Sequence, residues 1–161
     1  MTLVEWIRKE HRIFKGLMGN VANTKASDPQ TRLKLFNQAI KRLDAHGTAE
    51  EETLFKVMQT NQATRLASLE ALEWHRSARH MLNEIIKLDP KDEHWLPKFL
   101  VASGIIVAHI KVEEKNALST LQQAFKSTEI SRSNRDFRSV EDGILRRETQ
   151  GTYKMASKLK Y

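Results

Sequence analysis

The sequence predicts an all-α fold, an antiparallel up-down-up-down four-helix bundle followed by a basic C-terminal extension. Only 6 Gly and 3 Pro occur among the 161 residues, and no strand-like alternation of Val, Ile and Thr is evident. Apolar residues recur at steps of three and four along four long runs, which is the period of an amphipathic helix. Short breaks separate the runs, so consecutive helices are expected to lie antiparallel.

Capping and breaking residues give the bounds of the first two expected helices. The first helix is expected to run from just after Thr2 to about Asn23. Asp28 followed by Pro29 is typical of an N-cap with proline in the first turn, and predicts the start of the second helix. The periodicity of the second helix continues to about Thr60.

The third and fourth helices are separated by a proline. The third is expected to begin after Asn61 and to end near Leu88-Asp89-Pro90, because the residue before a proline is disfavoured in a helix. The fourth is expected to begin between Asp92 and Trp95 and to continue to about Lys126. Together the four helices form the first expected unit, residues 1–126.

Each helix carries an apolar stripe that we expect to face the core of the bundle. The stripes comprise Val4, Ile7, Phe14, Met18 and Val21 in the first helix, Leu33, Phe36, Ile40, Leu43, Leu54 and Val57 in the second, Leu66, Leu69, Leu72, Leu82 and Ile86 in the third, and Leu100, Ile105, Val112, Ala117 and Leu121 in the fourth. Six polar residues interrupt these stripes: His11, His46, Glu50, His75, His109 and Glu113.

The six polar residues belong to an internal repeat. The order Ala-His-x-x-x-Glu-Glu occurs at residues 45–51 and again at 108–114, so the histidine and the first glutamate recur 63 residues later. His11 and His75 are 64 residues apart, and each is followed by an arginine and, six residues on, by an apolar pair. We therefore interpret the first four helices as two copies of one helical hairpin.

The spacing predicts that the polar residues meet in one layer. Each histidine lies 13 to 17 residues from the nearest expected turns. That spread corresponds to about 6 Å along a helix that rises about 1.5 Å per residue. Residues four apart also share a helix face, so each His-x-x-x-Glu pair is directed at the same neighbour.

This donor set favours a pair of metal ions. Buried polar groups are costly without partners, and imidazole with carboxylate suits Fe, Mn or Zn. Six ligands exceed the four that one structural zinc ion usually takes. Shared between two ions, the set gives each ion two histidines, with Glu50 and Glu113 as bridges. The chain has no cysteine, which excludes disulfides, thiolate ligands and a cysteine nucleophile.

The pattern of a histidine on the first and third helices and His-x-x-x-Glu on the second and fourth resembles the hemerythrin-like, or HHE cation-binding, domain. The resemblance covers about Leu3 to Phe125. It implies a non-haem di-iron centre of two iron ions with an oxo or hydroxo bridge, in a protein that binds oxygen or, in some members, senses oxygen or iron, handles nitric oxide or decomposes peroxide. It also implies four terminal ligands and two bridging ones, which are His11, His46, His75 and His109, and Glu50 and Glu113, respectively.

Two positions depart from the oxygen-carrying members of that family. Arg79 stands where the carriers have a fifth histidine, and His80 cannot replace it because five residues is about 140° around a helix. Glu113 stands where the carriers have an aspartate, and it is one residue closer to its histidine. The more symmetric set resembles the sensor or enzyme-like branches, which argues against stable reversible oxygen carriage.

Other polar and aromatic residues are expected to have ordinary roles. Glu51 and Glu114 are rotated about 100° from the ligand face, so we expect them in solvent, although either could supply a third carboxylate. His80 and His94 are expected at the surface. The three tryptophans, Trp6, Trp74 and Trp95, are expected to serve packing rather than electron transfer.

The second expected unit is a basic extension, residues 127–161, with eight Lys or Arg against five acids. Its polar run from Thr128 to Arg138 is not expected to form a fifth core helix, and we interpret the extension as peripheral or partly disordered. Its charge leaves nucleic acid open as a partner, although no binding motif supports one. Without a secretory segment or an apolar run of about 20 residues, we expect a cytoplasmic protein with no membrane span.

Three functions from different classes stay open at this point. The leading one is a hemerythrin-like protein that binds or senses oxygen or a related small ligand, namely nitric oxide or peroxide. The second is a di-iron oxidase or peroxidase with turnover on peroxide, so the sequence leaves open whether the protein is an enzyme. The third is a regulatory module in which metal occupancy presents the basic tail to a partner.

Overall fold

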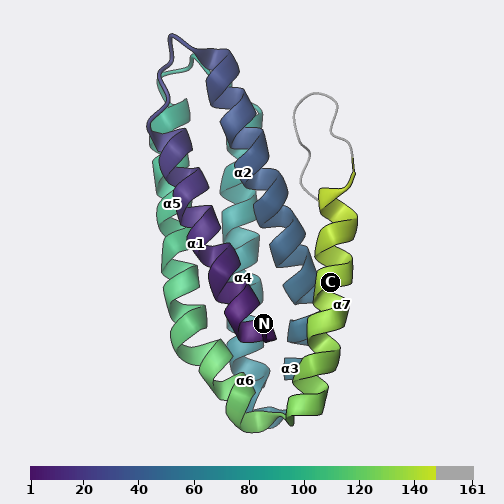
Figure 1. Cartoon of the computed structure of the whole chain (residues 1–161). Coiled ribbons are helices and arrows are strands. Elements are labelled where there is room, and N and C mark those ends of the chain that lie inside the picture. The colour runs from purple at the N-terminus through teal and green to yellow at the C-terminus, as the bar shows by residue number, and fades with distance from the viewer. Residues whose placement is uncertain (148–161) are drawn as a thin grey trace.

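The computed structural model describes residues 1–147 and contains four long helical runs that alternate in direction and pack as a bundle (Figure 1). The first run is α1 (Leu3–Ala22), and the second comprises α2 (Pro29–Ala49), the π-helical segment η1 (Glu50–Leu54) and α3 (Phe55–Gln59). The third is α4 (Gln62–Ile86), and the fourth comprises α5 (Trp95–Val112), the π-helical segment η2 (Glu113–Ala117) and α6 (Leu118–Ala124). The predicted all-α, up-down-up-down four-helix bundle is confirmed.

Side-chain caps set the starts of the first two runs where the sequence predicts them. The Glu5 N–H donates to Thr2 Oγ1 at 3.3 Å, and the Thr2 N–H donates to Glu5 Oε2 at 2.8 Å, which together form a capping box. The Thr31 N–H donates to Asp28 Oδ1 at 3.1 Å at the start of α2, and Pro29 is its first residue. These caps leave short connections that require neighbouring helices to run antiparallel.

The two π-helical segments are a feature that the sequence did not predict. One begins at Glu50 and the other at Glu113, the equivalent positions of the repeat. A π-helical turn holds about one residue more than an α-helical turn, so it shifts every later side chain around the axis. The expected stripe residue Val57 is accordingly only half-buried, whereas Phe55 and Met58 are fully buried.

The core consists of two hydrophobic clusters with a polar layer between them. One cluster contains Phe14, Phe36 and Phe99 and fills the half of the bundle where α2 and α5 begin. The other contains Ile7 and Phe55 and fills the half where α1 and α4 begin. The six polar stripe residues lie between the clusters along each helix, and all six are at least about nine-tenths buried.

Three residues that were expected in the core are exposed. Leu66 and Leu69 on α4 are 77% and 41% exposed, and Leu100 on α5 is 50% exposed. The buried faces of these helices are rotated from the expected ones and use small side chains, Ala71, Ala78 and Ala102, where the helices pack together. Large apolar residues therefore do not identify the buried face of a helix where two helices pack closely, because alanines occupy that face.

The expectation that the run Thr128 to Arg138 forms no fifth core helix is wrong. Residues Ser127–Leu145 form α7, a helix that packs along α2 and η1 on the outside of the four-helix bundle (Figure 1). Phe137 is completely buried in the second hydrophobic cluster, and Ile144 and Glu141 are also buried. The run is polar because only one residue per turn faces the bundle. The part of the extension after Arg147 lies outside the described residues.

The fourth run is more apolar than the sequence analysis allowed. The segment Trp95–Ala124 is long enough to cross a membrane and has a mean hydropathy of 1.4 over its most apolar 18-residue window. The same segment carries His109 and Glu113 into the polar layer of the bundle. Only 33% of that window is buried in the bundle, and Leu100 and Val101 are exposed, so part of the apolar character of this run lies on its outer face.

Candidate metal centre

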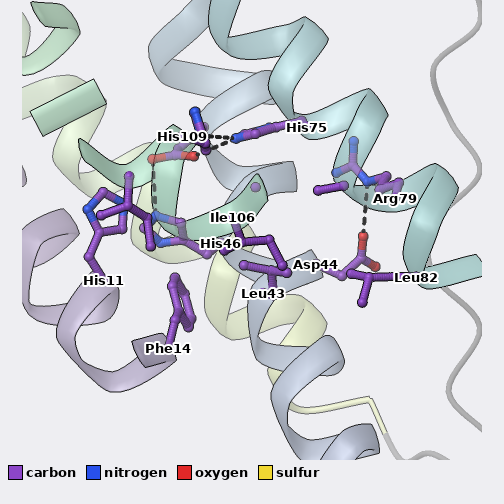
Figure 2. Close-up of a pocket in the computed structure, with 14 residues that line it drawn as sticks. His11, Phe14, Leu43, Asp44, His46, His75, Arg79, Leu82, Ile106 and His109 are labelled. Carbon is purple, nitrogen blue, oxygen red and sulfur yellow. Dashed lines mark hydrogen bonds and ion pairs between the residues drawn. The ribbon is translucent and has the colours of Figure 1, made fainter. Parts of the chain in front are cut away.

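The polar layer brings together all six residues that the sequence identifies as candidate ligands. His11 comes from α1, His75 from α4, and the two His-x-x-x-Glu pairs from the junctions of α2 with η1 and of α5 with η2. Figure 2 shows the four histidines approaching the same region from these different helices. Each helix of the bundle therefore contributes at least one side chain to a single buried centre.

Each glutamate lies between two histidines. Glu50 Oε1 is 3.0 Å from His46 Nε2, and Glu50 Oε2 is 3.3 Å from His75 Nε2. Glu113 Oε2 is 3.4 Å from His11 Nε2 and 3.5 Å from His109 Nε2. Each carboxylate thus connects a histidine of one hairpin to a histidine of the other, which is the position that a bridging ligand requires.

Two groups of donor atoms are compact enough to hold an ion each. The donor atoms of His11, His46 and Glu50 lie within 4.8 Å of one another, and so do those of Glu50, His75 and His109. The two groups share Glu50. His75 Nε2 is 2.9 Å from His109 Nε2. Two nitrogens bound about 2.1 Å from one ion at roughly a right angle would be about 3 Å apart, so this separation suits a shared ion.

The chemistry of the buried atoms also fits a metal. Both carboxylate oxygens of Glu50 and of Glu113, together with His46 Nε2, are buried and have no hydrogen-bond partner within residues 1–147. Three of the four carboxylate oxygens, Glu50 Oε1, Glu50 Oε2 and Glu113 Oε2, lie at ion-pair distances from histidine Nε2 atoms, but outside hydrogen-bond geometry. Buried carboxylates need a compensating positive charge, and a nitrogen and oxygen donor set suits first-row divalent metals.

In the metal-free chain, protons on two histidines supply that positive charge. Burial alone lowers the pKa of His46, but the carboxylates of Glu50 and Glu141 outweigh burial and raise this pKa to about 10. Burial is likewise outweighed by Glu50 and Glu51 at His75, whose pKa is raised to about 9. These two imidazolium groups hold the pKa of Glu50 well below its ordinary value, against the effect of burial.

The pKa of His109 changes in the opposite direction. Burial, followed by repulsion from the His75 imidazolium, lowers the pKa of His109 to about 3. Burial and repulsion from Glu50 raise the pKa of Glu113. The metal-free centre therefore concentrates its negative charge on Glu50 and its positive charge on the two histidines that contact Glu50.

A second set of carboxylates lies within hydrogen-bond distance of the Nδ1 atoms of three histidines. Glu51 Oε1 is 2.7 Å from His75 Nδ1, and Glu114 Oε1 is 2.9 Å from His11 Nδ1. A carboxylate that accepts from Nδ1–H fixes the tautomer in which Nε2 is free to bind a metal. The expectation that Glu51 and Glu114 lie in solvent is therefore wrong, and the signal for their role was their repetition directly after Glu50 and Glu113.

The third member of this set is Glu141, which the sequence analysis missed. Glu141 lies on α7, is buried, and places Oε1 3.3 Å from His46 Nδ1. No repeat or spacing connects Glu141 to the other residues, because α7 has no counterpart in the first hairpin. His109 Nδ1 has no hydrogen-bond partner within the described residues, and its ring stacks on Trp74 at 6.3 Å.

Arg79, the residue that replaces a fifth histidine, lies at the edge of the centre. Its Nη1 donates to Glu51 Oε1 at 2.6 Å, and its Nε is 3.5 Å from Asp44 Oδ1 (Figure 2). Lys15, at the matching place on α1, is exposed. Arg79 therefore supports the carboxylate that holds His75. His80 and His94 are exposed, as predicted.

A small cavity of about 40 Å³ adjoins the centre. Its walls include five of the six candidate ligands together with apolar side chains and Arg79 (Figure 2). Gly47 also lines the cavity, beside His75. A Cβ atom added at Gly47 would lie 3.4 Å from the His75 ring. The cavity has room for about three water molecules.

Comparisons with known proteins agree with this architecture. The hemerythrin HHE cation binding domain family matches residues 2–121. A crystal structure of an HHE cation binding domain-containing protein from Mycobacterium kansasii superposes with a TM-score of 0.77 at 16% identity, covering 89% of this chain and 87% of that one, and so shares the fold. A DNA nickase from Nostoc sp. is 21% identical over 147 residues, which are 91% of this chain and 41% of the relative. The chain thus spans less than half of that relative's length. Because the family match includes every candidate ligand from His11 to Glu113, the chain belongs to the hemerythrin HHE cation binding domain family.

Proposed function

We propose that this protein is a non-haem di-iron protein that binds or senses oxygen or a related small ligand, such as nitric oxide or peroxide. The observation that carries the proposal is the pair of donor groups that share Glu50. His11 and His46 would be terminal ligands of one iron ion, and His75 and His109 of the other. Glu50 and Glu113 would bridge the ions.

The residues of the chain account for the charge of such a centre. Iron bound there would supply open coordination positions and one-electron redox chemistry to a small ligand. Two glutamates offset two of the four charges of a pair of Fe²⁺ ions. The outer carboxylates Glu51, Glu114 and Glu141 orient their histidines and add further negative charge near the centre.

The size and lining of the cavity support a small ligand. A volume of about 40 Å³ admits a diatomic molecule or peroxide, but not an organic substrate of ordinary size. Phe14, Leu43, Leu82 and Ile106 give most of its wall an apolar character that suits an uncharged ligand. Each proposed iron ion has two histidines, so both would keep positions for ligands. We propose a cytoplasmic protein.

One experiment tests the proposal. The chain is purified without oxygen, loaded with Fe²⁺, assayed for iron, and followed by absorption while oxygen is added and then removed. We expect two iron ions per chain and charge-transfer bands that respond to oxygen. Iron binding at less than one ion per chain, with no response to oxygen, nitric oxide or peroxide, would refute the proposal.

The same preparation separates the alternative functions. Bands that vanish when oxygen is removed support reversible binding, whereas rapid peroxide consumption at low protein concentration supports a di-iron oxidase or peroxidase. A regulatory module acting through the basic tail would instead change its affinity for a partner between metal-free and loaded forms. Incubation with supercoiled plasmid tests the activity named for the cyanobacterial relative, and we expect no nicking above that of free metal ions.

A further inference from the structure

A carboxylate from outside the four-helix bundle reaches the metal centre. Glu141 lies on α7, beyond the residues that the family match covers. It is 1% exposed, and its two oxygens have different partners. Oε1 is 3.3 Å from His46 Nδ1, and Oε2 accepts from the Trp6 indole N–H at 2.8 Å. A buried carboxylate in this position requires donors on both oxygens, and α1 and α2 supply one each.

The surroundings of Glu141 hold it in this orientation. Phe137, one turn earlier on α7, is fully buried and its ring centroid is 5.4 Å from that of His46. On the other side of Trp6, Arg138 Cζ lies 4.3 Å from the indole centroid. Arg42, which pairs with the buried Glu10 at 2.8 Å, lies close enough to Glu141 to contribute to its electrostatic environment. Helix α7 is therefore docked at the level of the centre by packing and by charge.

We propose that Glu141 is a positioning residue that selects the metal-binding tautomer of His46, and that Trp6 fixes the carboxylate for this task. Acceptance of the Nδ1–H by Glu141 leaves Nε2 of His46, which faces Glu50, as the free ligand atom. The same arrangement links the docking of α7 to metal binding at the side of the centre formed by His11 and His46. This inference rests on the proposed metal site, but not on the identity of the small ligand.

Replacement of the Glu141 carboxylate by an amide tests this positioning role. In Glu141→Gln, two N–H groups, from Trp6 and His46, compete for one oxygen atom. The shorter bond to Trp6 directs the oxygen there, so the amide NH₂ faces His46 Nδ1 and favours the tautomer with the proton on Nε2. We expect Zn²⁺, used as a diamagnetic probe, to bind about 10- to 100-fold more weakly at one of two sites. The ¹⁵N shifts of His46 in the Zn²⁺-loaded chain report directly which ring nitrogen carries the proton.

A second substitution distinguishes positioning from packing. Trp6→Phe keeps a ring and removes the N–H that competes for the amide oxygen. In the double variant Trp6→Phe/Glu141→Gln the amide oxygen is free to accept from His46, so Zn²⁺ affinity is expected to recover about tenfold relative to Glu141→Gln alone. A merely structural role predicts the reverse, because two defects in the docking of α7 would weaken binding further. Asp136→Asn, the same chemical change at an exposed position of α7, is the matched control.

The outcomes separate this inference from the proposed function. Wild-type chain that binds neither Zn²⁺ nor Fe²⁺ would overturn both. Wild-type chain that binds two ions, together with a Glu141→Gln variant of unchanged affinity and tautomer, would overturn the role of Glu141 alone. A double variant that binds more weakly than Glu141→Gln would also overturn it. Weakened binding at one site, the changed tautomer and the recovery in the double variant would together establish it.

Discussion

Glu50 is the residue whose loss should affect both metal positions. It belongs to both compact donor groups, whereas His46 belongs to one. Binding free energies of roughly 10–16 kcal/mol for zinc sites with four protein ligands correspond to about 3 kcal/mol per ligand, or a little over a hundredfold in affinity. Glu50→Gln should therefore lower the binding affinity for both ions by about two orders of magnitude, and His46→Ala should lower the affinity for one ion by the same factor.

Metal content at a buffered free Fe²⁺ concentration makes this difference measurable. At a concentration about tenfold above the wild-type Kd, the wild-type chain should hold about 1.8 ions, His46→Ala about 1.0 and Glu50→Gln about 0.2. His94→Ala, at an exposed histidine, should match the wild type. The isosteric Gln keeps the shape of the layer, and circular dichroism checks the fold. Equal ion counts for Glu50→Gln and His46→Ala would show that Glu50 is not shared.

Four further predictions follow from the same geometry. Glu113→Ala should lower metal content sharply, because Glu113 Oε2 contacts a histidine of each donor group; a wild-type metal content would contradict its bridging position. Phe137→Ala should destabilise the chain by about 3–5 kcal/mol, and the thermal midpoint should fall by roughly 6–20 °C in a circular dichroism melt, whereas Leu66→Ala at an exposed site should change it little. Metal affinity should rise with pH up to about 10, because the raised pKa values of His46 and His75 keep both histidines protonated and these protons must leave on binding; proton release in a pH-stat checks this. The raised pKa of His46 should contribute stability to the metal-free chain that is fully present below about pH 6.5 and is lost as the pH rises through the folded pKa of His46, about 10; a urea midpoint that does not change over this range would contradict the ion pairs.

The repeat explains why the centre could be predicted from the sequence. Two helical hairpins that carry histidines and glutamates at the same depth leave little choice of where those side chains meet. The fold and the convergence of all six residues follow from local periodicity, turn chemistry and helix geometry. The identity of the buried faces was harder to predict, because Leu66 and Leu100 are exposed while alanines face the neighbouring helices.

Two features lay beyond sequence reasoning for physical reasons. A π-helical turn has no local sequence signal, since its wider turn is stabilised by the side chains that it places in the centre. Helix α7 buries one residue per turn, Phe137 and Glu141 among them, so its sequence is that of a solvated helix. Its contact with His46 joins residues 95 positions apart and outside the repeat.

The π-helical turns account for the doubled glutamates of the repeat. After Glu50 the next buried residues are Leu54, Phe55 and Met58, one position later than a continuous α-helix would place them. After Glu113 they are Ala117, Leu118 and Leu121, with the same shift. The extra residue in each turn returns the helix to the core while letting both acids face inward, the first to the centre and the second to a histidine Nδ1 on a neighbouring helix.

The approximate symmetry of the two hairpins is broken at one pair of histidines. His11 and His75 are equivalent, and each has a carboxylate on Nδ1 from the doubled glutamate of a neighbouring helix. His46 and His109 are also equivalent by sequence, yet only His46 has a carboxylate on Nδ1 within the described residues, because α7 packs mainly along α2 and η1. A histidine held by a carboxylate is the more basic ligand. Of the two proposed ions, the one bound by His11 and His46 should therefore be held more tightly than the one bound by His75 and His109.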